Sequence, residues 1–114
     1  MQDCIFCKIL RGEIPAKKVF ETDEVLAFDD INPVAPVHVV VIPKRHIATL
    51  NDAADGDAHT LGRLLLAAKS VAAAKGLAQE GYRAVVNTMA GAGQVVFHVH
   101  IHVFGGRDLR WPPG

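Results

Sequence analysis

Apolar residues recur along the chain at two spacings, one typical of strands and the other typical of helices. Alternating or β-branched runs predict five strands, at residues 18–21, 25–29, 38–42, 82–87 and 94–104. Hairpin-like spacing between these runs favours antiparallel pairing. We therefore expect an α+β fold with a five-stranded antiparallel sheet, formed by residues 1–114 as one domain.

The helical spacing predicts one long helix and one short helix. Between the polar residues 51–57 and Lys75, apolar side chains return at steps of three and four, which indicates a long helix that crosses one face of the sheet. Its predicted buried side consists of Leu61, Leu64, Leu65, Ala68, Val71 and Ala72. The short helix should run from an Asp3 N-cap to about Leu10, with Gly12 just past its end.

Composition narrows the classes of function. Lysine plus arginine equals aspartate plus glutamate at 12 each, so no net positive field favours nucleic acid or an anionic membrane as a partner. No apolar run approaches the roughly 18 residues of a transmembrane helix, and polar residues interrupt the N-terminal segment too early for a signal peptide. We expect a cytoplasmic protein whose two cysteines are thiols or metal ligands.

Three histidines alternate with apolar residues in the last predicted strand. Because side chains two apart share one face of a strand, His98, His100 and His102 should present their imidazoles together. They could be exposed polar residues, although three titratable rings at strict spacing make this the weakest interpretation. Two of them could bind zinc with a third ligand from His38, His46, Asp29 or Asp30. The third interpretation is an imidazole that attacks phosphorus and holds the group covalently.

Attack at phosphorus also needs hydrogen-bond donors for the phosphate oxygens and a proton donor for the leaving group. Residues 91–95, Gly-Ala-Gly-Gln-Val, predict a small turn directly before the histidines. Such a turn can present backbone N–H groups to an anion. Its position beside the three histidines therefore favours the nucleophile.

Cys4 and Cys7 lie on one side of the predicted short helix. A redox pair of this CxxC type is expected to follow a strand, whereas only three residues precede this one. Zinc suits the pair better but needs two more ligands, for which His46 and His98 are available.

Longer motifs accompany the histidines. They are Cys-Ile-Phe-Cys-Lys-Ile, Gly-Glu-Ile-Pro-Ala-Lys, Ala-Phe-Asp-Asp-Ile-Asn-Pro, Val-Ile-Pro-Lys-Arg-His, His-Val-His-Ile-His-Val-Phe and Gly-Gly-Arg-x-x-x-Trp-Pro-Pro-Gly. These motifs occur in the order expected for a known family, and together they cover essentially the whole chain. They resemble the Hint branch of the histidine triad (HIT) superfamily, the histidine triad nucleotide-binding proteins.

The resemblance implies a homodimer in which two five-stranded sheets join into one of ten strands. It implies hydrolysis of purine nucleoside phosphoramidates and acyl-adenylates through a covalent nucleotidyl-histidine, with no cofactor needed for catalysis. The alternative is a purine-nucleotide-binding interaction module with vestigial catalysis. Turnover of an adenosine phosphoramidate, as opposed to AMP binding alone, separates the two.

The resemblance also implies a role for each site residue. His100 would be the nucleophile, His102 would contact the phosphate and assist the leaving group, and His98 would orient His100. Asp30 would accept hydrogen bonds from the ribose hydroxyls, although it could simply cap the proline turn that follows it. The base pocket would comprise Ile5, Phe6, Phe28 and Ile31, and the phosphate would be surrounded by Asn87, Gly93, Gln94 and Val95.

This chain departs from the family pattern at two places. Val95 stands where the branch commonly has serine, so the backbone N–H is kept and a hydroxyl is lost. Many members lack the cysteine pair. In bacterial relatives that have it, the resemblance implies a structural zinc held by Cys4, Cys7, His46 and His98.

Three further residues also have expected places. His38 is expected to contact the site residues without touching the substrate, rather than only to pack in the core. His59 is expected on the surface of the long helix. Trp111 stands in a tail with little to pack on, and the resemblance implies that this tail reaches the partner's active site and shapes the choice of leaving group.

Overall fold

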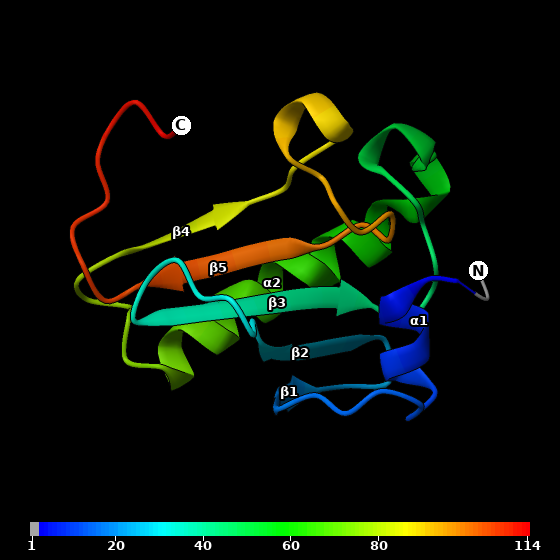
Figure 1. The fold of residues 1–114 in the computed structure, drawn as a ribbon, viewed down its shortest axis with the longest axis horizontal. Helices are drawn as coiled ribbons and strands as arrows, with labels where there is room; N and C mark the ends of the chain where they lie inside the picture. The colour runs from blue at the N-terminus through cyan, green and yellow to red at the C-terminus, as the bar shows by residue number, and fades with distance from the viewer. Residues whose placement is uncertain (1–2) are drawn as a thin grey trace.

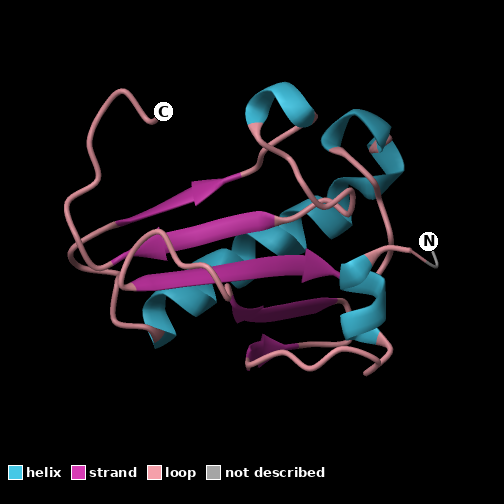
Figure 2. Cartoon of the chain, in the orientation of Figure 1, coloured by secondary structure: helices cyan, strands magenta, loops and turns pink. Residues whose placement is uncertain are grey.

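The computed structural model describes residues 3–114, and its elements follow the predicted order. The helices are α1 (Ile5–Leu10) and α2 (Ala58–Ala74), and the strands are β1 (Lys18–Glu21), β2 (Val25–Asp29), β3 (Val37–Pro43), β4 (Tyr82–Val85) and β5 (Ile101–Gly105). Three short 3-10 turns are η1 (Leu50–Asp52), η2 (Asp55–Asp57) and η3 (Ala90–Ala92). Figure 2 shows that loops connect the short turns η1 and η3 to the longer helices and strands.

The five strands form one sheet in the order β1-β2-β3-β5-β4, with every neighbouring pair antiparallel. This confirms the predicted α+β fold with a five-stranded antiparallel sheet. In Figure 1, α2 crosses behind the sheet, whereas the short α1 lies at one end of it, beside β2 and β3. The strands β1 and β4 form the two edges.

Each face of the sheet has its own apolar cluster, because successive strand residues point to opposite faces. The larger cluster packs beneath α2 and includes Val39, Val41 and Val103 with Leu64 and Val71 of the helix. The smaller cluster lies on the α1 face and consists of Phe6, Ile9, Leu26, Phe28, Val40 and Ile42. The α1 face therefore has an apolar floor beside which the polar site residues stand.

The predicted boundaries of three strands were wrong. The last strand begins at Ile101 rather than at residue 94, β4 ends at Val85 rather than at Asn87, and β3 gains one residue at each end. Ile101 pairs with Val41, so the next positions toward the N-terminus lie opposite the end of β3. Pro43 has no N–H to donate there. The Val99 N–H instead donates to the Ile47 carbonyl, and the segment before Ile101 continues without a ladder.

Two details of the helices also differ from the prediction. The N-cap of α1 is Cys4 and not Asp3, and Sγ of Cys4 accepts a hydrogen bond from the Cys7 N–H. Gly12 follows the helix with φ +78°, as expected of a residue at which a helix ends. Leu65 is 60% exposed, because it lies about 100° around α2 from the buried Leu64. Within residues 3–114, no helix combines the length and apolar character needed to cross a bilayer.

Candidate active site

The three alternating histidines lie on the α1 face of the sheet. His98 and His100 are buried in the extended segment before β5, and His102 is half-buried within β5. Their alternation continues past the end of the ladder because Val99 and Ile101 both pack into the cluster beneath α2. The structure thus brings the imidazoles together, with the ring centroids of His100 and His102 4.8 Å apart.

The protonation pattern of His100 follows from one hydrogen bond. Its Nδ1 lies 2.7 Å from the backbone carbonyl oxygen of His98. Because a carbonyl oxygen can only accept, Nδ1 must carry the proton. Burial lowers the pKa of His100 below its ordinary value, although the His98 carbonyl and the Asp30 charge oppose the shift. The neutral ring therefore has its lone pair on Nε2, which is the form needed for nucleophilic attack.

His102 has the opposite tautomer, set by His38. The Val34 N–H donates to Nδ1 of His38 at 3.1 Å, so the neutral His38 ring carries its proton on Nε2. That Nε2 lies 2.9 Å from Nδ1 of His102, which must then accept. Consequently the proton of a neutral His102 is on Nε2. Burial, followed by repulsion from His100 and His38, lowers the pKa of His102 to about 4, while Asp30 opposes the shift.

The two neighbouring rings therefore present complementary groups. His100 offers an unprotonated Nε2 and His102 an Nε2–H donor. Sequence patterns could not reveal this assignment, because it depends on the Val34 N–H and the His98 carbonyl, which are backbone groups. A nucleophile beside a hydrogen-bond donor is the arrangement that phosphoryl or nucleotidyl transfer requires.

Asp30 follows β2 and is half-buried beside His38. One carboxylate oxygen accepts the Asn32 N–H at 2.8 Å, which is the turn-capping contact considered for it. The other oxygen lies 3.4 Å from Nε2 of His38 and 3.9 Å from Nδ1 of His102. Asp30 thus serves the turn and places negative charge beside both rings.

The four residues expected to line a base pocket fall into two pairs. Phe6 and Phe28 are buried, and their rings meet edge to face at 5.5 Å; Phe6 also meets the edge of the His100 ring at 5.1 Å. Ile5 and Ile31 are 43% and 92% exposed and stand outside this cluster. One residue absent from the prediction, Val96, packs against the cluster from the segment that follows η3.

The residues expected around a phosphate group lie on the connection from β4 to β5. Asn87 is half-buried, Gly93 has φ +94°, and Val95 is 85% exposed. Gln94 differs from its expected role, because its side chain is buried and bonded to the protein. Trp111 is 82% exposed in the tail, whose Arg110 carbonyl accepts a hydrogen bond from Arg83.

A second cluster joins α1 to the histidine segment. Nδ1 of His98 lies 3.4 Å from Sγ of Cys4, 3.6 Å from Sγ of Cys7 and 3.1 Å from Nδ1 of His46. Sγ of Cys7 also lies 3.3 Å from Nδ1 of His46. Tetrahedral zinc at normal bond lengths needs edges of about 3.4 Å between two nitrogens and about 3.6 Å between sulfur and nitrogen. The four ligand atoms therefore fit a closed zinc site.

The protonation of the cluster is compatible with metal binding. Nε2 of His98 lies 2.8 Å from the Pro43 carbonyl and must donate to it, which leaves the lone pair of Nδ1 facing the two sulfurs. Burial lowers the pKa of His98 to about 4 and also lowers that of His46. Burial, with the neighbouring Cys4, raises the pKa of the Cys7 thiol in the absence of a cation.

The polar groups of Asp30, His38 and His102 also lie within 4.8 Å of one another. Their hydrogen bonds do not suit a metal. The Val34 N–H occupies Nδ1 of His38, so Nε2 of that ring holds a proton where a metal would need a lone pair.

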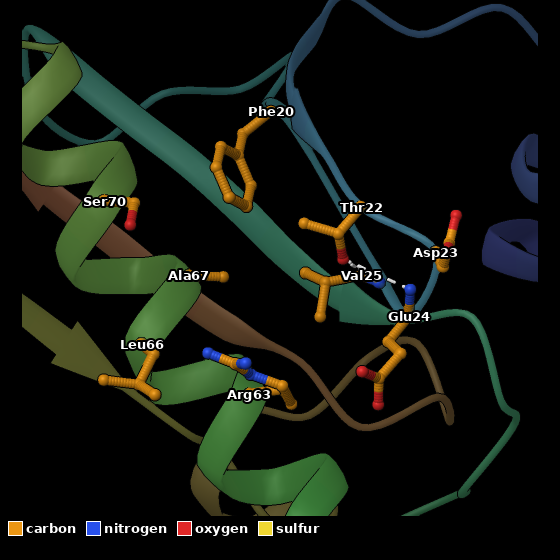
Figure 3. Close-up of a pocket in the computed structure, with 9 residues that line it drawn as sticks. All are labelled: Phe20, Thr22, Asp23, Glu24, Val25, Arg63, Leu66, Ala67 and Ser70. Atoms are coloured by element: carbon orange, nitrogen blue, oxygen red, sulfur yellow. Dashed lines mark hydrogen bonds between the residues drawn. The ribbon is translucent and has the colours of Figure 1, made fainter.

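A separate surface pocket of about 240 Å³ lies on the opposite side of the sheet, between the β1–β2 turn and α2. Figure 3 shows Phe20 and Val25 facing Ala67 of the helix, and Leu66, Arg63 and Glu24 also line the pocket. None of the predicted site residues lines it. The chemistry of the histidines is therefore independent of this pocket.

Comparisons with known proteins identify the family of this chain. Residues 11–109 match the family described as HIT domain. An uncharacterized HIT-like protein of Synechococcus elongatus is 55% identical over 113 residues, 99% of this chain and 98% of that protein. The crystal structure of a HIT family hydrolase from Legionella pneumophila has a TM-score of 0.96 and 54% identity, covering 98% of this chain and 100% of that one. A histidine triad nucleotide-binding protein from Candida albicans has a TM-score of 0.81 and 39% identity, covering 89% and 73% respectively.

The lowered histidine pKa values predict a loss of stability in acid. A histidine in the unfolded chain has a pKa of about 6.5, whereas folding holds that of His102 near 4. The unfolded chain therefore binds more protons than the folded protein in this window, and the free energy of unfolding must fall as the pH drops from about 6.5 to 4.

Replacing His102 with glutamine should make that fall shallower, as measured by urea unfolding at a series of pH values. The control is His59→Gln, because His59 is exposed on α2 and pairs with Glu24 away from the site. Its pH dependence should match that of the wild type. If the free energy of unfolding depended on pH equally in His102→Gln and in the wild type, the lowered pKa of His102 would be contradicted.

Proposed function

The chain belongs to the HIT family, and we propose that it hydrolyses purine nucleoside phosphoramidates and acyl-adenylates through a nucleotidyl group held on His100. The observation that carries the proposal is the pair of complementary tautomers, with a lone pair on Nε2 of His100 beside an Nε2–H on His102. The hydrolase among the similar structures supports hydrolysis, and the nucleotide-binding protein among them supports a nucleotide as the substrate.

In the first step, Nε2 of His100 attacks the α-phosphorus and the bond from phosphorus to the leaving group breaks. A carboxylate leaves an acyl-adenylate without needing a proton. The amine of a phosphoramidate needs one, which comes from solvent water, while the Nε2–H of His102 donates a hydrogen bond to the leaving nitrogen and stabilises its departure. The attacked ring becomes a cation, and the hydrogen bond from its Nδ1–H to the His98 carbonyl then becomes charge-assisted.

In the second step, water attacks the phosphorus and the bond to Nε2 of His100 breaks. The nucleoside monophosphate leaves, one proton of the water passes to solvent, and His100 returns to its neutral form. The same His98 carbonyl holds the ring in place in both steps. This placement is the orientation part of catalysis, in which a fixed geometry replaces a bimolecular encounter.

The remaining contacts of the nucleotide are proposed from the resemblance and the positions in the fold. The ribose hydroxyls would use the Asp30 oxygen that does not cap the turn. The base would lie against Ile5 and Ile31, with Phe6 and Phe28 as the apolar layer beneath. The phosphate oxygens would use Asn87 and backbone N–H groups near Gly93 and Val95. The exposed Val95 side chain supplies no hydroxyl there.

Replacing His100 with alanine should abolish the hydrolysis of an adenosine phosphoramidate, with kcat lowered by at least about 10⁴-fold because the nucleophile is lost. AMP binding should survive. The control is His59→Ala, which removes an exposed imidazole on α2 and should keep full activity.

A covalent adenylyl adduct should be detected on wild-type protein by mass spectrometry under conditions that avoid acid, and it should be missing from His100→Ala. Full activity in His100→Ala would refute the mechanism. AMP binding by the wild type without an adduct or turnover would instead identify a nucleotide-binding module.

A structural zinc ion is proposed for the second cluster, held by Cys4, Cys7, His46 and His98. A closed four-ligand site contributes folding energy rather than an open coordination position. The ion would neutralise two thiolates and tie α1 to the segment that carries the catalytic histidines.

Protein prepared without chelators should contain about one zinc per chain by elemental analysis, since the four donors match a structural site. Cys7→Ser should lose most of the metal and lower the melting temperature, whereas Asp3→Ser, beside the cluster and exposed, should do neither. A wild-type preparation without metal would contradict the proposal.

The homodimer implied by the resemblance is proposed to form along β4. This edge strand has a free side, and the main contacts of α2 are with β1, β2, β3 and β5. Tyr82 at the start of β4 and Val86 just past its end are each 38% exposed, and Leu65 of α2 is 60% exposed. A second copy would cover these apolar groups and extend the sheet to ten strands. The exposed Trp111 is then available to reach the partner's site.

A further inference from the structure

We infer that Gln94 is a positioning residue, which holds a strained loop of residues 89–94 in the shape that the phosphate contacts need. The role of this loop in phosphate binding rests on the proposed function. The way in which Gln94 holds the loop does not. The expectation from sequence was that Gln94 itself surrounds the phosphate. Its contacts in the structure assign it a different task.

The loop begins with an unfavourable backbone conformation. Met89 has φ +72° and ψ +166°, and it is the only residue other than glycine with positive φ in the described part of the chain. This region of φ and ψ is populated almost entirely by glycine, because a Cβ atom crowds the backbone there. Such a conformation persists only where surrounding contacts hold it.

The side chain of Gln94 supplies those contacts. Its Oε1 accepts the Met89 N–H at 2.8 Å, and its Nε2 donates to the Ala48 carbonyl at 2.9 Å and to the Val96 carbonyl at 3.1 Å. Its backbone N–H donates to the Met89 carbonyl at 3.1 Å. Main chain and side chain of Gln94 thus close the loop on both sides of the strained residue.

These bonds leave Gln94 no donor for a substrate. The residue is 4% exposed, and both hydrogens of its amide are used within the protein. Glutamate would keep the acceptor for Met89 but would set a carboxylate against two carbonyl oxygens. Methionine has the same length and makes none of the three side-chain bonds. Glutamine is therefore the side chain that meets this set of partners.

The loop fixes the start of the segment that carries the site. Val95 follows Gln94 directly, and its N–H has no acceptor among residues 3–114. Val96 packs against the cluster that contains Phe6 and Phe28. The bond to Ala48 also ties the loop to the chain just after His46 and Ile47. By holding Met89, Gln94 thus sets where the free Val95 N–H stands relative to His100.

The test is a double-mutant cycle between Gln94→Met and Met89→Gly, measured first by thermal unfolding. Gln94→Met should lower the melting temperature by about 5 °C or more, because buried polar groups lose their partners. The surface control Gln79→Met should not change it. Glycine adopts the Met89 conformation without strain, so Met89→Gly should raise the melting temperature of the wild type. It should raise that of Gln94→Met by less, because the strain at position 89 relaxes once the Gln94 bonds are lost.

Met89→Ala is the matched control, because it keeps the Cβ atom and the strain. It should give no such rise in the melting temperature of the wild type. Additive effects of the two substitutions on the melting temperature, or equal effects of glycine and alanine at position 89, would overturn the inference. If Gln94→Met does not fold, Gln94→Ala, which also makes none of the three side-chain bonds, takes its place in the same cycle.

The second readout is nucleotide binding and turnover. Gln94→Met should weaken AMP binding and leave adenosine binding unchanged, and it should lower kcat/KM for an adenosine phosphoramidate by about 100-fold through misplacement of the loop. Met89→Gly should restore part of this loss, which it could not do if Gln94 were a ligand of the phosphate. Loss without rescue would overturn the link to catalysis. Should the wild type show no turnover at all, the proposed function fails while the thermal cycle still decides how the loop is held.

Discussion

The hydrogen bond from Nδ1–H of His100 to the backbone carbonyl of His98 is the interaction on which the chemistry of this fold depends. It is buried and 2.7 Å long, and its acceptor belongs to the residue two positions earlier in the same segment. Strict alternation makes this contact possible, because both side chains share a face while the residues between them remain in the core. A local backbone contact thus fixes the tautomer of a nucleophile.

His98 is the residue that connects the two clusters. Its ring donates from Nε2 to Pro43 and turns Nδ1 toward Cys4, Cys7 and His46, while its carbonyl holds His100. The short helix α1 is therefore more than a cover for the apolar face. It brings two sulfurs to His98 and one aromatic ring, that of Phe6, to the edges of both His98 and His100. Burial removes water from around these two rings and so makes their charged forms less favourable. This is why the pKa values of His98 and His100 are lowered.

Much of the fold could be predicted from the sequence, because it depends on side-chain periodicity. The alternation that ends in Val103 and the steps of three and four around Leu64 located the sheet and α2. The start of β5 could not be read in the same way, since it is set by where β3 ends and by the missing N–H of Pro43. Leu65 was wrongly predicted to be buried, because the apolar residues of α2 cover a wider part of its surface than the face that packs on the sheet.

The site was predictable to the level of residue types but not of hydrogen bonds. The spacing of the histidines and the cysteine pair located two clusters that the fold does bring together. The partners that assign their protons are the Val34 N–H and the carbonyls of Pro43 and His98, and backbone groups have no sequence signal. Gln94 shows the same limit. The family resemblance placed it at the phosphate, whereas its partners Met89, Ala48 and Val96 show a structural side chain.

The most direct test of this account is the ¹⁵N NMR spectrum of the imidazole rings of the free protein at about pH 7.5, well above the pKa of about 4 of His102. From the hydrogen bonds of the two rings we expect that Nδ1 of His100 is protonated and its Nε2 is not, while His102 shows the reverse pattern. A His100 ring protonated on Nε2, or one that exchanges freely between its two tautomers, would contradict it.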